Sequence, residues 1–371
     1  MAKGDARHQP RVVDVLRAIE DAFPSHWAES WDKVGLLCGD PDAPASGVHV
    51  CLDPSVSALE QAISAGANVL ATHHPLLLQP EMPISGGRSY EIVRAAIEAN
   101  ISIIAAHTNL DRAPKGASAL ADAIGVPSGE PLERSYMPMV MVTVYVPAES
   151  AVSLREAMAK AGAGRIGAYQ GCSFSVDGTG RFMPMAESNP YIGASGQESS
   201  VPEQRIEAVC APAAVDGVVS AIRTSHPYEE PLVTLTEMRI PRSAARLGRV
   251  CTIPSTTLAS LAEQVASKLD CAPRIWGDPL ARVSKVATAS GSAGSLIPDA
   301  LAADADVLIA GEVRYHDALD AVAQHLCVIE IGHDISEWPL VHVLADAIRN
   351  TPGLSRERVT VGRPERKWWT F

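Results

Sequence analysis

The sequence predicts an α/β protein with a layered core of two similar half-domains, each a sheet with flanking helices, interrupted by an α+β insert. Strand-like and helix-like segments alternate over residues 1–125 and again over 247–371, which is typical of sheets covered by helices. Residues 126–246 have a different order of elements. We therefore predict a first core half at 1–125, an inserted domain at 126–246 and a second core half at 247–371.

The first half begins the alternation with an apolar strand and a helix that is bounded by Pro54 and Gly66, the usual punctuation of helix ends. A second strand is apolar almost throughout, as in parallel sheets that are covered on both faces. The predicted elements are a strand at 48–53, a helix at 54–66, a strand at 68–72, a helix near 90–99 and a strand at 101–106.

The middle of the chain has the order β-α-β-β-α-β, which is the ferredoxin-like plan. A stretch rich in Gly, Ser and Pro at 187–202 predicts a loop inside it. The predicted elements are strands at 139–146, 171–177, 205–210 and 233–238 and helices at 153–162 and 214–224.

The second half repeats the pattern of the first. Residues 67–74 resemble residues 305–312, and each segment is followed by a helix and by a strand that ends in His, which supports two similar half-domains. The predicted elements are strands at 283–289, 307–310 and 326–331 and helices at 295–303, 314–324 and about 336–349.

Composition limits the class of function. The 371 residues are 47% hydrophobic and 20% charged, which fits a globular chain with a real core and excludes a disordered one. The net charge of −12 disfavours a nucleic-acid partner, because such binding needs Lys and Arg against phosphates. We expect no membrane span, since no apolar run approaches about 20 residues. The seven scattered cysteines and the lack of an apolar leader favour a cytoplasmic location.

Histidines follow three of the predicted strands. His73 and His74 come after the strand at 68–72, His107 follows the next strand, and His333 follows the strand at 326–331. In open α/β sheets, ligands bind beyond the carboxyl ends of the strands. These positions therefore favour a binding site, although a lone histidine is as often packed or solvated as it is a ligand.

Two carboxylates accompany these histidines, and each has a structural alternative. Asp111 lies four residues after His107 and could instead close an Asx turn. We place His333 in a loop and predict Ser336 as the N-cap of the last helix, so Glu337 in the first turn could serve the helix dipole alone.

Taken together, the groups predict a dinuclear metal site, because five ligands exceed the three or four of one zinc ion. One bridging carboxylate suits two ions about 3.5–4 Å apart. Nitrogen and oxygen ligands without thiolate fit Zn, Fe, Mn, Co or Ni. The candidate ligands are His73, His74, Asp111, His333 and Glu337. The candidates for acid/base or ligand-orienting roles are His107, Glu312 and His316.

The motifs at 29–36, 72–75, 107–111, 311–312 and 332–337 occur in an order that resembles the Nif-three-like dinuclear metal-binding family, also called GTP cyclohydrolase 1 type 2 homolog. The resemblance covers both end segments, about two-thirds of the chain. It implies that His74 and Asp111 hold one metal, that His73 and His333 hold the second, and that Glu337 bridges them.

The resemblance extends to the insert and to assembly. Longer members carry a PII-like or CutA-like insert, and residues 226–231 are similar to that module. The family implies a homohexamer, a trimer of dimers, with metal sites facing an internal cavity. Lys33 stands where the family usually has Asn, and Asp334 where it usually has an aromatic residue, which puts the choice of substrate in doubt.

Two functions follow from these observations. The first is a metal-dependent hydrolase in which a metal-bound water attacks a small molecule such as a nucleotide, with GTP implied by the family name. The alternative is a non-enzymatic metal-binding protein, regulatory or chaperone-like, whose insert senses a ligand. Turnover after metal loading distinguishes them.

Overall fold

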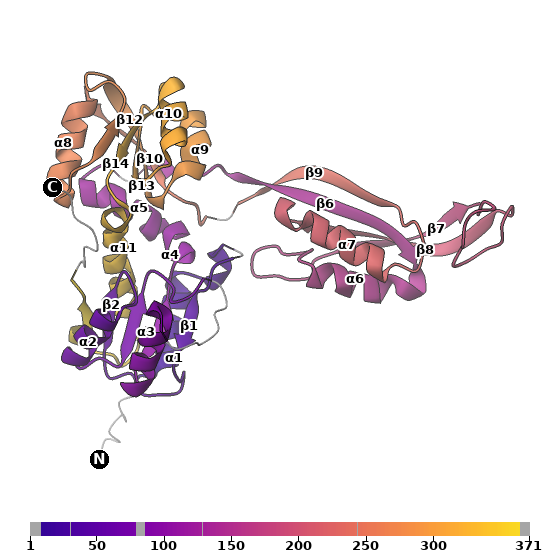
Figure 1. Cartoon of the computed structure of the whole chain (residues 1–371), viewed down its shortest axis with the longest axis horizontal. Helices are drawn as coiled ribbons and strands as arrows, with labels where there is room; N and C mark the ends of the chain where they lie inside the picture. Colours follow the sequence, from indigo (N-terminus) through magenta and orange to yellow (C-terminus); the bar gives the residue numbers. More distant parts are fainter. Residues whose placement is uncertain (1–8, 30, 79–85, 128, 243, 364–371) are drawn as a thin grey trace, which may run out of the picture. The chain divides into compact units, whose positions relative to one another are not determined.

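The computed structural model describes residues 9–29, 31–78, 86–127, 129–242 and 244–363. The chain divides into two compact units (Figure 1). The first unit combines Met1–Arg134 with Ala244–Phe371, and the second is Ser135–Ser243. The boundaries of the second unit lie inside the range 126–246 that the sequence suggests for the insert. Each unit has its own hydrophobic core.

The first unit contains a five-stranded sheet of order β1-β4-β3-β2-β15. Its central strands are parallel and almost entirely buried, as their apolar sequences require. Helices α2 (Val56–Ser64) and α3 (Arg88–Glu98) connect them. The strands are β1 (Gly35–Cys38), β2 (Val48–Cys51), β3 (Val69–Thr72), β4 (Ser102–Ala105) and β15 (Val359–Val361).

A six-stranded sheet of order β11-β14-β13-β12-β10-β5 forms the other half of this unit. Strands β12, β13 and β14 are parallel, like β2, β3 and β4 in the first sheet. The strands are β5 (Glu130–Pro131), β10 (Arg249–Thr257), β11 (Arg274–Trp276), β12 (Arg282–Ser292), β13 (Val307–Glu312) and β14 (Cys327–Glu330). The helices between them are α8 (Leu258–Leu269), α9 (Ile297–Ala302) and α10 (Tyr315–Ala323).

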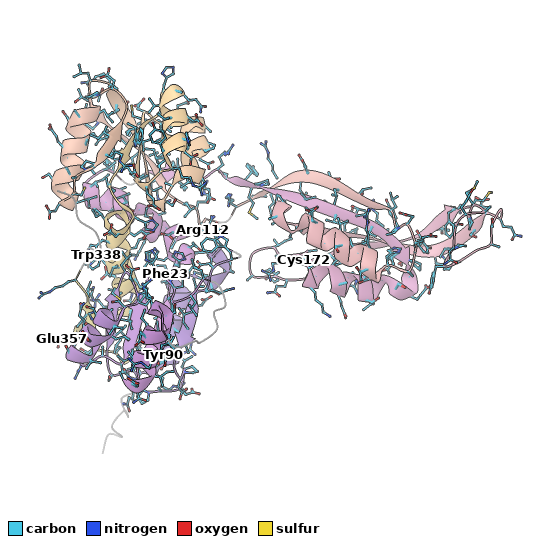
Figure 2. All side chains as sticks on the ribbon, in the orientation of Figure 1. Phe23, Tyr90, Arg112, Cys172, Trp338 and Glu357 are labelled. Carbon is cyan, nitrogen blue, oxygen red and sulfur yellow. The ribbon has the colours of Figure 1, made fainter. Side chains whose placement is uncertain are left out.

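The two halves exchange helices. Helix α11 (His333–Ile348) follows β14, yet Leu340 and Leu344 pack into the core of the first sheet beside α1 (Val12–Ala22). Phe23 belongs to the same core and Trp338 packs against it; both are labelled in Figure 2. Helix α5 (Pro114–Ile124) makes the reverse exchange: it follows the strands of the first sheet, yet its apolar face packs against α8 of the second half. The halves are therefore interlocked within one unit.

Helix α11 begins three residues earlier than the sequence suggests. Its N-cap is Gly332, whose positive φ of 99° sets the turn after β14, so His333 is the first helical residue and the prediction of a loop there was wrong. Ser336 is not an N-cap: its hydroxyl accepts from the Gly291 N–H at 2.8 Å and donates to the His333 carbonyl at 2.7 Å. This start places His333 and Glu337 one turn apart on the same face of the helix.

The second unit follows the order β6-α6-β7-β8-α7-β9 and forms an antiparallel sheet of order β7-β8-β6-β9. Helices α6 and α7 pack on one face through a core that includes Val142, Val144 and Ile206. The elements are β6 (Tyr136–Pro147), α6 (Ala151–Lys160), β7 (Phe174–Phe182), β8 (Ser199–Cys210), α7 (Val215–Ser225) and β9 (Val233–Pro241).

Among the helices of the described residues, none has the length and apolar character needed to cross a bilayer.

Candidate metal centre

The predicted ligands converge at the carboxyl ends of strands from both sheets of the first unit. His73 and His74 directly follow β3. Asp111 lies in α4 (Thr108–Arg112), the short helix after β4. His333 and Glu337 are in the first turns of α11, after β14. The structure thus brings together groups that the sequence separates by more than 260 residues.

Glu337 lies at the centre of this cluster and is 4% exposed. Its Oε1 lies 3.0 Å from Nε2 of His333 and 3.7 Å from Nε2 of His73. Its Oε2 lies 2.9 Å from Nε2 of His74. One carboxylate therefore faces three imidazole nitrogens, which is the arrangement expected of a bridging ligand.

Nε2 of His73 is buried and has no hydrogen-bond partner. His73 is 0% exposed, and Oδ1 of Asp111 and Oε1 of Glu337 each lie 3.7 Å from this nitrogen. An unpaired polar atom in the protein interior is costly. Donor atoms that share a metal ion at about 2.0–2.2 Å are themselves roughly 3–3.5 Å apart. The 3.7 Å distances around His73 are slightly wider, so a small approach of the side chains would let these groups share a divalent cation.

Each histidine of the cluster is oriented by an acceptor at its other ring nitrogen. Because Nδ1 donates a proton to an acceptor, the lone pair of the neutral ring is on Nε2, the nitrogen that faces the cluster. The Nδ1 contacts are His73 to the Ala106 carbonyl at 3.0 Å, His74 to Asp53 at 2.9 Å, His107 to Asp32 at 2.9 Å and His333 to Glu312 at 3.0 Å.

Sequence reasoning missed Asp53 and Asp32 as orienting residues. Asp53 follows β2, so it lies at the same sheet edge as His74, and this position was an available signal. Asp32 accepts from both the backbone N–H and the hydroxyl of Thr108 as well as from His107. Although burial acts in the other direction, these hydrogen bonds lower the pKa of Asp32 to about 2, so its carboxylate is anionic.

The electrostatics of the cluster favour positive charge around Glu337. Burial opposes protonation of His74, but its hydrogen bonds to Asp53 and Glu337 raise the pKa of His74 to about 10. The hydrogen bond to Glu337 raises the pKa of His333 to about 9 against the effect of burial. Burial also disfavours the anion of Glu337, yet the facing imidazoles hold its pKa well below the ordinary value. Protons on these imidazoles therefore balance the buried negative charge of Glu337, as a bound metal ion would.

The geometry groups the ligands as His73, Asp111 and Glu337 on one side and as His74, His333 and Glu337 on the other. This differs from the pairing implied by the resemblance, in which His74 joins Asp111. The reason is local: His73 points into the interior toward α4, whereas His74 lies against Asp53 and α11. Glu337 is common to both groups, as expected of a bridge.

The three acid/base candidates occupy different positions. His107 joins His73 and His74 in a third close group of nitrogen atoms. Glu312, at the end of β13, accepts from Nδ1 of His333 and thus orients a ligand. His316 is exposed on α10 and belongs to none of the metal-capable groups found among the described residues.

Two glycines allow β12 and β13 to approach α11 closely. Gly291 has a positive φ of 64°, and a Cβ on it would collide with Oε1 of Glu337. A Cβ on Gly311 would collide with the Ser336 hydroxyl. Gly291 thus lies directly against the cluster, where its N–H also donates to the Ser336 hydroxyl.

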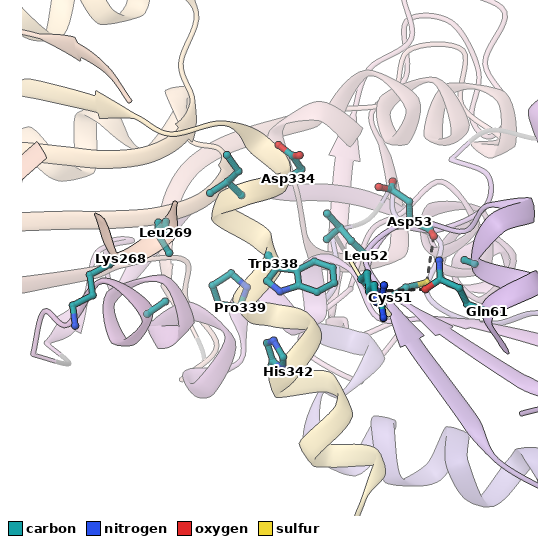
Figure 3. A pocket seen from close by; sticks show the side chains of 14 residues that line it. Cys51, Leu52, Asp53, Gln61, Lys268, Leu269, Asp334, Trp338, Pro339 and His342 are labelled. Atoms are coloured by element: carbon teal, nitrogen blue, oxygen red, sulfur yellow. Dashed lines mark hydrogen bonds between the residues drawn. The ribbon is translucent and has the colours of Figure 1, made fainter. Parts of the chain in front are cut away.

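A cavity of about 320 Å³ adjoins the cluster (Figure 3). Asp53 lies in its wall and also hydrogen-bonds His74, which connects the cavity to the candidate ligands. Asp334, Trp338 and His342 line it from α11, at a spacing of four residues. Lys268 from the end of α8 contributes a cation to the same wall.

Comparisons with known proteins agree with this arrangement. Residues 10–361 match the family model described as Duf34/NIF3 (NGG1p interacting factor 3). A "GTP cyclohydrolase 1 type 2 homolog" of Mycobacterium bovis is 34% identical over 361 residues, covering 93% of each chain. A protein of the same name from Halalkalibacterium halodurans is 34% identical over 328 residues, covering 87% of this chain and 88% of that protein.

Solved structures give the same result. The crystal structure of a Bacillus cereus protein related to NIF3 superposes with a TM-score of 0.65 at 30% identity, covering 98% of this chain and 99% of the other. Staphylococcus aureus protein SA1388 superposes with a TM-score of 0.64 at 26% identity, covering 97% and 98%. With the family model matched over nearly the whole chain, this protein belongs to the Duf34/NIF3 family.

Proposed function

We propose that this protein is a metal-dependent hydrolase that holds two divalent cations and acts on a small molecule. The observation that carries the proposal is the arrangement around Glu337, where one buried carboxylate faces the Nε2 atoms of His73, His74 and His333. Hydrogen bonds at Nδ1 orient each of these rings toward it. Catalytic two-metal sites have this combination of bridging carboxylate and oriented ligands.

We assign one ion to His73, Asp111 and Glu337 and the other to His74, His333 and Glu337, since these are the two close groups that contain the Glu337 carboxylate. Three protein ligands for each ion leave coordination positions for water or substrate, as in catalytic sites. When bound, the ions would polarise the substrate and lower the pKa of a water molecule toward neutrality. The nitrogen and oxygen donors suit Zn, Fe, Mn, Co or Ni.

Among the three candidates, we assign the acid/base role to His107. Its Nδ1 is held by Asp32, so Nε2 can hold or release a proton beside the two metal groups. Glu312 is engaged with His333, which makes it an orienting residue. His316 has no comparable position.

We propose a nucleotide or a related compound as the substrate. The name of the relatives, GTP cyclohydrolase 1 type 2 homolog, supports this class. The cavity beside the cluster supports a small-molecule substrate, because Trp338 offers an aromatic surface for a base and Lys268 and Arg363 offer cations for phosphate.

We also propose that the second unit is a ferredoxin-like module of the PII or CutA kind. Its element order, β-α-β-β-α-β, supports this assignment. Its sheet order of β7-β8-β6-β9 and the packing of both helices on one face give further support.

Metal analysis followed by a turnover screen tests the hydrolase. Protein reloaded in turn with Zn, Fe, Mn, Co and Ni is analysed by ICP-MS and then incubated with nucleotides and phosphoesters. We expect about two ions per chain and turnover with at least one metal. His74→Ala should lose both turnover and one ion with the fold intact by circular dichroism. His26→Ala, at an exposed histidine outside the cluster, is the matched control. Full turnover in His74→Ala would refute the hydrolase.

A further inference from the structure

A second cavity, of about 700 Å³, lies entirely within the second unit. Strands β7 and β8 form its floor, and the loop at 184–192 and the turn at 228–232 form its other walls. The hydrolase described above uses none of these residues. The turn belongs to the motif at 226–231, and the loop lies largely within the stretch at 187–202.

The cavity lies on the face of the sheet opposite to the helices. Val144 and Val146 of β6 point into the core beneath α6 and α7. Tyr145 lies between them and therefore points to the other face. Tyr145 pairs with Arg205 on β8, which pairs with Val176 on β7, and all three residues line the cavity.

Aromatic rings gather at one end of this cavity. Phe182 and Tyr228 have ring centroids 5.7 Å apart at an interplanar angle of 64°. Tyr191, from the loop, lies 6.4 Å from Tyr228 at 53°. Tyr228 thus lies between the other two rings at steep angles to both, and all three residues line the cavity. Rings in this arrangement attract a cation placed within about 6 Å of their centres.

A carboxylate lies beside these rings. Glu203 is 9% exposed, and its Oε1 accepts from the Tyr228 hydroxyl at 2.7 Å. Gly180 makes room for it, because a Cβ there would collide with the Glu203 carboxyl group. Burial and the adjacent Glu203 both raise the pKa of Tyr228, so the hydroxyl remains a donor and the negative charge stays on the carboxylate.

The net charge of the cavity lining is also negative. Four acidic residues line the cavity, namely Asp177, Glu203, Glu229 and Glu230. Of the two arginines in the lining, Arg205 forms an ion pair with Glu207. Apart from this paired arginine, the four carboxylates outnumber Arg181, so the cavity favours a cation over an anion.

The loop is attached to the wall opposite. The Asn189 N–H donates to Oε2 of Glu229 at 3.0 Å, and Tyr191 contacts Tyr228. These contacts hold the loop at the rim, where it can cover a bound molecule.

We propose that this cavity binds a small organic ammonium ion, with the Phe182, Tyr191 and Tyr228 rings around the charged nitrogen and the Glu203 carboxylate as counter-charge. Alkylated ammonium groups fit best, because aromatic faces replace their weak hydration at little cost. A bare metal ion fits less well, since it would need several oxygen or nitrogen ligands at close range. This inference is independent of the metal centre in the first unit.

Calorimetric titration of the full-length protein with choline tests the inference. The comparison ligand is 3,3-dimethylbutan-1-ol, which has the same shape without the charge. We expect choline to bind with a dissociation constant in the range of about 0.01–1 mM and the neutral alcohol to bind at least about tenfold more weakly. Absence of binding up to about 10 mM choline, or equal binding of the two, would overturn the proposal.

Variants locate the site. Tyr191→Leu and Tyr228→Leu should each weaken choline binding by about 5–30-fold, and Glu203→Gln should weaken it by a similar factor. Tyr136→Leu, at an exposed tyrosine outside this lining in the same unit, should leave binding unchanged. Circular dichroism checks the fold of each variant. Tyr191 is 54% exposed, so its variant remains informative if Tyr228→Leu unfolds. Binding unaffected by Tyr191→Leu and Glu203→Gln would place choline elsewhere and refute the site.

Discussion

His333 and Glu337 lie one turn apart on α11, and Nε2 of His333 approaches Oε1 of Glu337 to 3.0 Å. The other oxygen of the same carboxylate lies 2.9 Å from Nε2 of His74, which follows a strand of the other sheet. Glu337 is therefore common to both groups of candidate ligands, and its loss should affect both of the proposed ions together.

Replacement of Glu337 by Gln should lower the metal content from about two ions per chain to less than one, because the amide removes the charge common to both groups. ICP-MS on the reloaded protein measures this. Glu357→Gln, at an exposed carboxylate in another part of the same unit, is the control and should keep both ions. A Glu337→Gln protein that retains two ions would show that the carboxylate is not a bridge.

Asp53→Ala should weaken metal binding by about 10–100-fold, since the Nδ1 proton of His74 loses its acceptor and the ring loses its orientation. Competition with a chromogenic chelator gives the affinities. The exposed Asp346 is paired with Arg349 on α11, away from the cluster, so Asp346→Ala should match the parent protein. Equal affinities of the parent and Asp53→Ala would contradict an orienting role.

Gly291→Ala should destabilise the first unit by about 1–3 kcal/mol and reduce its metal content, because the new methyl group meets Glu337 at a residue with positive φ. Gly217→Ala should have the opposite effect. Gly217 lies in α7, has an ordinary helical φ, and a Cβ at this position would meet open space. Alanine should therefore stabilise the second unit by up to about 1 kcal/mol. Thermal unfolding monitored by circular dichroism compares the two, and a stabilised Gly291→Ala protein would refute the close approach.

Arg112→Met should lower the free energy of unfolding by about 3–5 kcal/mol. Arg112, labelled in Figure 2, is buried and pairs with Glu133 at 2.7 Å and with Glu29. Its loss leaves these carboxylates without that cation. The double variant Arg112→Met/Glu133→Gln should recover part of the loss. Urea denaturation measures both proteins, and a single variant as stable as the parent would show that the pair contributes nothing net.

The sequence was sufficient to place the residues after β3 and β4 at one edge, because these strands are parallel neighbours in one sheet. The residues after β14 come from the other sheet, so this argument does not bring them to the same site. The predicted strands near residues 48, 68 and 101 correspond to β2, β3 and β4. Apolar runs of this kind predict buried strands, because a strand covered on both faces needs apolar residues along its whole length.

Other features depend on contacts that no local pattern contains. Helix α11 starts at His333 because Gly332 forms the turn before it and because the Ser336 hydroxyl does not cap the helix. That hydroxyl instead accepts a hydrogen bond from the N–H of Gly291, a residue 45 positions away. The pairing of β15 with β2 joins residues more than 300 positions apart. The division of the ligands into two groups depends on the directions of the His73 and His74 side chains. The sequence shows only that these residues are adjacent, so it does not determine those directions.

The exchange of α11 has a consequence for biosynthesis. The core around α1 is complete only when Leu340 and Leu344 arrive, about 200 residues after the end of α5 leaves the ribosome. At synthesis rates of about 5–20 residues per second, the nascent first half waits roughly 10–40 s with this apolar surface uncovered. The second unit, which has its own core, can fold within that interval. A chaperone that holds the emerging N-terminal half should therefore improve the yield of this protein more than one that acts after release.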